Sequence, residues 1–347
     1  MVTTMSNSLA QTKERLEDLK EKVLSGQSLR REDAWFILTF DDSRIDLLLE
    51  YADQIRDATK GTEIDLCSVV NARSGSCSEN CSFCAQSVHF STGVKTYPLL
   101  DTGTLVESAR HAQTNGANKF CIATSGRGIR KQKDLDDICH AVQTIREEVG
   151  ISMCATLGEL TEEQMIALKK AGVRRFHHNL ETSENFFNTI CTTHTYQDRL
   201  ERIRTAKRVG LSTCCGGIFG MGESQEDRID LAFAIKELDV DSVPINFLVP
   251  VAGTPLENAV PPSPEECLKI IALFRFLMPD KEIRVCGGRV TGLKELHPKI
   301  FAGGASGMMI GNYLTTMGPP PEEDLKMLEA LGMTPRKPEA NGLEPSF

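Results

Sequence analysis

Short apolar runs alternate with amphipathic helical patterns along most of the chain, and this alternation constrains the fold more than any other feature. Each run has the length of a buried strand, and the segments between the runs carry apolar residues at helical spacing. Strands are expected at 64–70, 119–124, 151–156, 174–179, 211–219, 242–248, 282–286 and 305–310. Helices are expected between them at 104–115, 134–149, 161–171, 195–209, 225–238 and 264–276. Strands that alternate with helices form a parallel sheet, and eight of them favour an α/β fold of the TIM type, a closed (β/α)8 barrel.

The two ends of the chain depart from this alternation. Residues 1–60 carry only helical patterns, and these helices could not bury their apolar faces alone. We therefore expect an N-terminal helical cap over 1–60 that packs on a barrel domain over 61–332. Residues 333–347 are rich in proline and polar side chains and are expected to be disordered. Within the barrel, Thr161 and Gln164 form the pattern of a helix capping box.

Composition excludes several classes of function. The 347 residues include 39 Lys and Arg against 48 Asp and Glu, and this net charge of −9 argues against broad binding to nucleic acid or anionic membranes. No stretch is apolar for long enough to span a membrane, and the first residues lack the apolar core of a secretion signal. A cytoplasmic protein is expected. In that reducing compartment twelve cysteines are too many to be incidental, so some of them are expected to bind metal as thiolates.

Three cysteines lie within eight residues directly after the first expected strand. Cys77, Cys81 and Cys84 have the spacing C-x3-C-x2-C, which lets one short loop offer three thiolates to an iron–sulfur cluster. Three protein ligands leave one iron open for a small molecule. The alternative is a zinc site completed by His89, since structural zinc takes four ligands. Position at the carboxyl end of a barrel strand favours an active site.

A second group of cysteines lies inside the expected strands. Residues two apart on a strand share a face, and a polar residue stands two positions before each of these cysteines. A polar side chain facing the helix layer would be costly, so these pairs are expected to point into the barrel. The pairs are Lys119 and Cys121, Ser152 and Cys154, Ser212 and Cys214, and Arg284 and Cys286. Four thiols from different strands predict a second cluster. Other cysteines, Cys67, Cys139, Cys191 and Cys267, are expected to be core or helix-face residues.

The first cysteine motif, with Phe83 before its last cysteine, resembles the signature of the radical S-adenosylmethionine enzymes. The resemblance implies a 4Fe–4S cluster whose open iron binds S-adenosylmethionine. It further implies reductive cleavage of that cofactor to a 5′-deoxyadenosyl radical, which abstracts hydrogen from a substrate.

Longer strings narrow the resemblance to the biotin synthases. These strings are CATLGEL at 154–160, HHNLETS at 177–183, CGGIFGMGE at 215–223 and SVPINFLVPVAGTPL at 242–256. The similarity covers about 65–331. It implies a transferase of biotin biosynthesis that inserts sulfur into dethiobiotin, the sulfur being supplied by an auxiliary iron–sulfur cluster. It also implies an electron donor such as flavodoxin or ferredoxin, and a homodimer.

The resemblance assigns metal ligands residue by residue. Cys77, Cys81 and Cys84 match the ligands of the 4Fe–4S cluster, and an auxiliary 2Fe–2S cluster matches Cys121, Cys154, Cys214 and Arg284. Cys286 departs from the family pattern. It stands two residues beyond Arg284 on the same face, so it is an alternative fourth ligand, and four thiolates suit a 4Fe-type cluster as well as a 2Fe–2S cluster.

Cofactor and substrate residues also follow from the resemblance. Those expected beside S-adenosylmethionine are Phe83, Asn179, Glu181, Arg199, Gly217 and Ile218. Those expected to hold the ureido ring of dethiobiotin are Asn179, Asn246 and His177, and His177 stands where an asparagine is common.

Two other functions are compatible with part of the sequence. A relative from hydrogenase maturation or pyrrolysine biosynthesis shares the first cysteine motif, but the strand cysteines and Asn246 favour sulfur insertion. A non-catalytic iron–sulfur or zinc module leaves the polar barrel interior unexplained.

Overall fold

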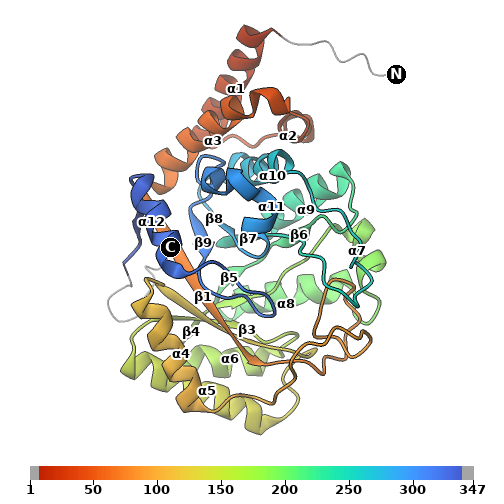
Figure 1. The fold of residues 1–347 in the computed structure, drawn as a ribbon, viewed down its shortest axis with the longest axis vertical. Coiled ribbons are helices and arrows are strands. Elements are labelled where there is room, and N and C mark those ends of the chain that lie inside the picture. Colours follow the sequence, from red (N-terminus) through yellow and green to blue (C-terminus); the bar gives the residue numbers. More distant parts are fainter. Residues whose placement is uncertain (1–7, 338–347) are drawn as a thin grey trace.

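The computed structural model describes residues 8–337, and its core is a closed barrel of parallel strands (Figure 1). The hydrogen-bonded order is β1-β2-β3-β4-β5-β7-β8-β9, and β1 also pairs with β9, which closes the barrel. β6 continues the line of β5 by pairing with β7. The expected TIM-type barrel is thereby confirmed. The strands are β1 (Glu63–Arg73), β2 (Lys119–Thr124), β3 (Ser152–Thr156), β4 (Val173–His177), β5 (Ser212–Cys214), β6 (Gly217–Phe219), β7 (Ser242–Phe247), β8 (Glu282–Val285) and β9 (Gly307–Met309).

Helices surround this barrel, and most of them begin at a side-chain cap. Thr161 and Gln164 form the expected capping box, and Gly172 ends the same helix in a left-handed conformation with φ 115°. Ser224 and Ser263 cap two further helices in the same way. The helices of the barrel are α4 (Thr102–Thr114), α5 (Gln132–Glu148), α6 (Glu162–Ala171), α7 (Glu184–Ile190), α8 (Tyr196–Arg208), α9 (Gln225–Leu238), α10 (Pro264–Leu277), α11 (Arg289–Leu293) and α12 (Pro321–Ala330). In residues 8–337 no helix is both long enough and apolar enough to cross a membrane.

The fifth strand is interrupted, whereas the sequence predicts one run over 211–219. β5 ends at Cys214, and pairing resumes at Gly217. At Gly216 the backbone presses against β7, so closely that a Cβ there would lie 1.8 Å from the carbonyl oxygen of Pro244. The carbonyl of Gly216 instead accepts hydrogen bonds from the backbone N–H groups of Leu180 and Glu181, at 3.1 and 3.2 Å. The break therefore joins the fifth strand to the turn that follows β4.

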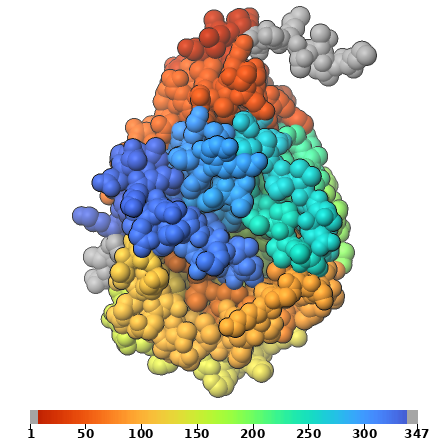
Figure 2. Space-filling model, in the orientation of Figure 1, coloured from red at the N-terminus to blue at the C-terminus, as the bar shows by residue number. Residues whose placement is uncertain are grey.

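Three N-terminal helices lie at one end of the molecule (Figures 1 and 2). They are α1 (Leu9–Leu24), α2 (Arg31–Leu38) and α3 (Ile45–Lys60). α2 and α3 pack against α10, and Leu16, Leu48 and Ile55 are fully buried. Ion pairs from Arg31 to Asp230 (2.6 Å) and to Glu226 also tie α2 to α9.

The C-terminal segment is ordered for longer than the sequence predicts. Thr334 and Pro335 form a short strand, β10, that pairs with Glu63 and Ile64 of β1. Its backbone thus completes the hydrogen bonding at the start of β1. The rest of the expected disordered tail, from residue 338 onward, lies outside the described residues.

Candidate functional site

One cavity of about 330 Å³ lies inside the barrel, and most of the predicted site residues line it. These residues come from seven strands and from the loops that follow them. They are Phe83, Cys121, Cys154, His177, Asn179, Glu181, Cys214, Ile218, Asn246, Arg284 and Cys286. Arg199 and Gly217 do not line the cavity but contact residues of its wall.

The loop of three cysteines is held in shape by Gln86. The Gln86 carbonyl accepts a hydrogen bond from the N–H of Cys77 at 3.0 Å, and its side-chain oxygen accepts one from the N–H of Gly75 at 3.2 Å. A tight turn follows, in which the N–H of Cys84 donates to the Cys81 carbonyl at 3.0 Å. Cys77 and Cys81 are buried and Cys84 is half-buried. Three thiols on one buried loop fit the thiolate set that a 4Fe–4S cluster requires.

This loop lies beside a segment that is far away in the sequence. In Figure 2 the orange segment that follows the three cysteines borders the cyan segment near residue 250. The two backbones are so close that a Cβ on Gly253 would lie 2.1 Å from the carbonyl oxygen of Ser91. A glycine is therefore required where the chain after β7 meets the cysteine loop.

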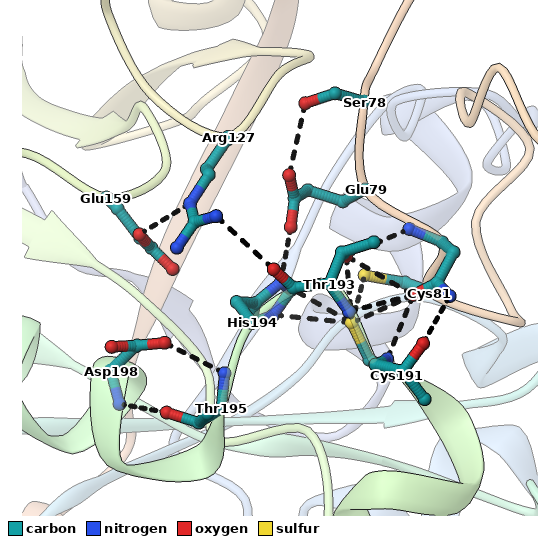
Figure 3. Close-up of polar contacts among 12 residues, drawn as sticks. Ser78, Glu79, Cys81, Arg127, Glu159, Cys191, Thr193, His194, Thr195 and Asp198 are labelled. Atoms are coloured by element: carbon teal, nitrogen blue, oxygen red, sulfur yellow. Dashed lines mark hydrogen bonds and ion pairs between the residues drawn. The ribbon is translucent and has the colours of Figure 1, made fainter.

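Cys191 is a buried core residue, as the sequence predicts, and its thiol also contacts the cysteine loop (Figure 3). Its Sγ lies 3.7 Å from the Sγ of Cys81. The hydrogen bond between the two thiols lowers the pKa of Cys191 to about 3 and raises the pKa of Cys81. Nothing in the spacing of Cys191 indicated this contact, since it lies in the loop between α7 and α8.

A chain of polar contacts runs from the cysteine loop to the cofactor-side residues. Glu79 accepts a hydrogen bond from Nδ1 of His194 at 2.7 Å (Figure 3). Nε2 of His194 accepts one from Nε of Arg199 at 3.1 Å. Nη1 of Arg199 then donates to the Asn179 carbonyl at 2.8 Å and lies 3.4 Å from Oε1 of Glu181. Arg199 is thus a buried positioning residue and not the solvated surface charge that is usual on a helix.

The turn after β4 presents Glu181 to the cavity. Glu181 has φ 72°, a left-handed conformation that non-glycine residues seldom adopt. Its carbonyl accepts a hydrogen bond from the N–H of Ile218 at 2.8 Å, and its carboxylate accepts one from Nδ2 of Asn179 at 3.2 Å. At Gly217 a Cβ would lie 2.6 Å from the Glu181 carbonyl oxygen. The glycine therefore permits the close approach that fixes this carboxylate.

Asn179 and Asn246 are oriented by backbone groups around the broken strand. Oδ1 of Asn179 accepts a hydrogen bond from the N–H of Gly216 at 3.0 Å. Nδ2 of Asn246 donates to the Gly217 carbonyl at 3.1 Å, and its Oδ1 accepts from the N–H of Gly287 at 2.9 Å. A primary amide has two N–H donors and two acceptor sites, so each side chain keeps hydrogen-bonding capacity for a ligand.

Cysteines from the first three strands meet within the barrel. Cys121 and Cys154 stand opposite each other in the register of β2 and β3. Cys67 of β1 is a buried core residue that packs with them and also lines the cavity, so it faces the barrel interior and not the helices. The missed signal was Asp65, which stands two positions before Cys67 just as polar residues precede the other inward cysteines.

Cys214 differs from these three because a histidine contacts its thiol. Nδ1 of His177 lies 3.3 Å from the Sγ of Cys214. Burial alone would raise the pKa of this thiol, but the contact with His177 lowers it to about 7. By contrast, burial raises the pKa of Cys121 and, together with its contact to Cys67, that of Cys154. Cys214 is therefore the most readily ionised thiol of the strand group.

Arg284 and Cys286 lie at the carboxyl end of β8. The Arg284 guanidinium pairs with Asp65, and its Nε is buried with no hydrogen-bond partner among the described residues. Such an orphaned donor fits a site that takes an anionic group. The thiol of Cys286 is 3% exposed, and burial raises its pKa to about 12. Both candidate fourth ligands therefore line the cavity.

Comparisons with known proteins agree with this geometry. Residues 73–235 match the model of the Radical SAM superfamily, and residues 244–334 match that of the Biotin and Thiamin Synthesis associated domain. A biotin synthase from Geobacter sulfurreducens is 47% identical over 92% of this chain and 98% of its own length. A biotin synthase from Geotalea daltonii is 49% identical over 92% of this chain and 97% of its own.

Solved structures share the fold at much lower identity. Methylornithine synthase (PylB) superimposes with a TM-score of 0.82 at 20% identity, covering 92% of this chain and 97% of its own. The FeFe-hydrogenase maturase HydG from Carboxydothermus hydrogenoformans gives a TM-score of 0.77 at 18% identity, covering 94% and 80%. These two likenesses show the fold alone, whereas the identity to the curated relatives decides between the families. The chain belongs to the biotin synthase family of radical S-adenosylmethionine enzymes.

Proposed function

We propose that this protein converts dethiobiotin to biotin by inserting one sulfur atom between two unactivated carbons. The observation that carries the proposal is the barrel cavity of about 330 Å³, which is lined both by residues assigned to the cofactor and by residues assigned to the auxiliary cluster. Of these lining residues, Asn179 and Glu181 are assigned to S-adenosylmethionine. Cys121, Cys154 and Cys214 are assigned to the auxiliary cluster that supplies the sulfur.

Cys77, Cys81 and Cys84 hold the 4Fe–4S cluster in this proposal. S-adenosylmethionine, bound to that cluster, supplies a 5′-deoxyadenosyl radical for hydrogen abstraction. Glu181 accepts hydrogen bonds from the cofactor's hydroxyl groups, a role supported by its carboxylate at the cavity wall. Phe83 and Ile218 provide apolar contacts, and Gly217 allows the backbone to approach closely.

The substrate's ureido ring is bound by Asn179, Asn246 and His177. A cyclic urea offers N–H donors and a carbonyl acceptor, which complement the free donors and acceptors of the two amides. The amides are already oriented by backbone hydrogen bonds, so little side-chain entropy is lost on binding. His177 contacts Cys214, and this contact puts the urea-binding residues next to the sulfur-source thiols.

The auxiliary cluster is bound by Cys121, Cys154 and Cys214, with Arg284 or Cys286 as the fourth ligand. With Arg284 the site matches a 2Fe–2S cluster, and with Cys286 a 4Fe-type cluster. The buried thiols and the orphaned Nε of Arg284 support an anionic inorganic group at this place. The group supplies the sulfur atom.

Further features of the proposal concern partners and location. An electron donor such as flavodoxin or ferredoxin reduces the 4Fe–4S cluster, and the protein acts as a homodimer. All twelve cysteines are free thiols, which supports a reducing compartment, the cytoplasm. The N-terminal helices over 1–60 form a cap on a barrel domain over 61–332.

Anaerobic turnover tests the proposed function. Reconstituted protein is mixed with S-adenosylmethionine, dethiobiotin and reduced flavodoxin, and the products are identified by mass spectrometry. We expect 5′-deoxyadenosine and biotin. The matched variant Cys121→Ala should still form 5′-deoxyadenosine but no biotin, because only the sulfur source is damaged. If the wild-type protein forms 5′-deoxyadenosine without biotin, the assigned substrate is wrong, and if it forms neither, the radical chemistry is wrong.

A further inference from the structure

Two cysteines that lie 110 positions apart in the sequence are in contact beside the cysteine loop. The Sγ atoms of Cys81 and Cys191 are separated by 3.7 Å (Figure 3). Both residues are buried, at 8% and 2% exposure. Cys191 is not needed by the proposed reaction, and its place against a cluster ligand therefore calls for another explanation.

The backbones on either side of this contact are tied together. The N–H of Ser82 donates to the Ile190 carbonyl at 2.8 Å. Oδ1 of Asn80 accepts hydrogen bonds from the N–H groups of Thr192 and Thr193, at 2.9 and 3.2 Å. Each cysteine is thus flanked by residues that hold the opposite segment. These hydrogen bonds hold the two thiols close together independently of any bond to Cys81 itself.

A mononuclear metal site is the competing explanation. Ligand atoms of Cys81, Cys191 and His194 lie within 4.8 Å of one another, which is a spacing that a metal ion could use. However, both ring nitrogens of His194 are occupied, one by Glu79 and the other by Arg199. The guanidinium of Arg199 would also repel a dication. The pair of thiols remains as the reactive unit.

We propose that Cys81 and Cys191 form a disulfide when the protein has lost its cluster to an oxidant, and that this bond preserves Cys81 for reassembly. A disulfide needs an S–S distance of about 2.05 Å. The two sulfur atoms, now 3.7 Å apart, therefore have to approach each other by about 1.65 Å. A lone Cys81 thiolate, in contrast, can be oxidised to sulfinic acid, which cannot be reduced by thiols. The inference rests on the proposed function only for the role of Cys81 as a cluster ligand.

The chemistry balances with hydrogen peroxide as the oxidant. One thiolate attacks a peroxide oxygen, becomes a sulfenic acid and releases hydroxide, which takes up a proton to give water. The second thiol then attacks the sulfenic sulfur, the S–S bond forms, and a second water leaves. Two thiols lose two electrons and two protons, and one peroxide becomes two waters. A dithiol reductant reverses the disulfide by exchange.

Peptide mapping tests the proposal on the reconstituted holoenzyme. The protein is exposed to hydrogen peroxide until its visible cluster absorbance is lost, free thiols are blocked, and the unreduced chain is digested. Cleavage after Glu79, Phe83, Phe187 and Tyr196 puts Cys81 alone in fragment 80–83 and Cys191 alone in fragment 188–196, separate from Cys77 and Cys84. We expect these two fragments to be joined, and to be separate in the protein with an intact cluster.

Two variants complete the test. Cys191→Ala should yield several-fold more Cys81 sulfinic acid, and less cluster should return after reduction and reconstitution. Cys139→Ala, at a half-buried cysteine of α5, should behave as wild type. Cys81 joined to Cys77 or Cys84, or equal recovery of Cys81 thiol in wild type and Cys191→Ala, would overturn the proposal. Should the chain never acquire the cluster absorbance, the proposed function fails, while the joined fragments still report on the disulfide.

Discussion

The Arg284 guanidinium of β8 pairs with the Asp65 carboxylate of β1 across β9, the strand that closes the barrel. Asp65 also accepts a hydrogen bond from Lys119 at 3.2 Å and lies 3.9 Å from Nη1 of Arg175. Three cations therefore share one buried carboxylate beside the strand cysteines. The Arg284 guanidinium opposes the rise in pKa that burial causes at Cys121 and Cys154, because a nearby cation favours the thiolate form.

Replacing Asp65 by asparagine should destabilise the fold. Asp65→Asn removes the carboxylate that pairs with the buried Arg284 guanidinium, and loss of one partner from a buried ion pair costs about 3–5 kcal/mol. Urea unfolding of the cluster-free protein at pH 7 measures this loss. Asp46→Asn is the matched control, because Asp46 pairs with Lys299 at an exposed site and its loss should be close to neutral. Equal stability of Asp65→Asn and wild type would show that the cations find other partners.

The contribution of Asp65 should depend on pH in a defined direction. Burial alone would raise its pKa, but Arg284, Lys119 and Arg175 outweigh burial and hold the pKa well below 3.8. Because the folded-state pKa is lowered, the contribution is fully present above the unfolded-state pKa of about 3.9 and is lost as the pH falls further. The stability difference between wild type and Asp65→Asn should thus be constant from about pH 7 to pH 5 and shrink below about pH 4. A difference that already vanishes near pH 6 would contradict the assigned pKa.

Cys286→Ala addresses the fourth ligand of the auxiliary cluster. With Cys286 as a ligand of a 4Fe-type cluster, the reconstituted wild-type protein should hold about eight iron atoms, against six with a 2Fe–2S cluster. The variant should lose auxiliary iron and biotin formation while keeping the cleavage of S-adenosylmethionine. Iron analysis and Mössbauer spectroscopy measure these changes, with Cys139→Ala as the control. A Cys286→Ala protein that keeps all its iron and its sulfur insertion leaves Arg284 as the ligand.

Glu181→Ala should weaken the binding of S-adenosylmethionine. Hydrogen bonds to a charged group contribute about 1.5–3 kcal/mol, so Kd should rise roughly 10- to 100-fold in equilibrium dialysis. Glu184→Ala, an exposed position three residues away, serves as the control and should leave Kd unchanged. Glu181→Asp should restore most of the affinity, since it keeps the carboxylate. Unchanged binding by Glu181→Ala would remove Glu181 from the cofactor site.

The alternation of apolar runs with helical patterns predicts the barrel, and the two-residue repeat of side chains along each strand predicts most of the residues that point into it. β2 and α9 have the bounds expected from the sequence, 119–124 and 225–238. These bounds are confirmed because the residues that the local periodicity marks as apolar are also the ones that tertiary packing buries. The prediction of one continuous fifth strand is wrong. Its break at Gly216 depends on the close approach of Pro244 from β7, and the local sequence pattern contains no information about that contact.

Contacts between loops lay beyond the reach of periodicity. Glu79 and His194 are 115 residues apart, and neither belongs to a strand or helix whose period fixes its direction. Cys191 also lies in a loop, so its sequence position does not predict its contact with Cys81, although the spacing of the first cysteine motif does identify Cys81 as a cluster ligand. Cys67 is different, since Asp65 two residues earlier already carried the signal on a regular strand.

At the break in the fifth strand, backbone hydrogen bonds run to the turn after β4 that carries Glu181. The Gly216 carbonyl accepts hydrogen bonds from the N–H groups of Leu180 and Glu181, and the Glu181 carbonyl accepts one from the N–H of Ile218. The backbone hydrogen bonds between strands are interrupted here. In their place, both the N–H and the carbonyl of Glu181 are bonded to the fifth strand, as they would be within a sheet. A substitution that made this strand continuous would remove the carbonyl and N–H groups that hold Glu181 in its left-handed turn, so the break is a feature to preserve in any redesign.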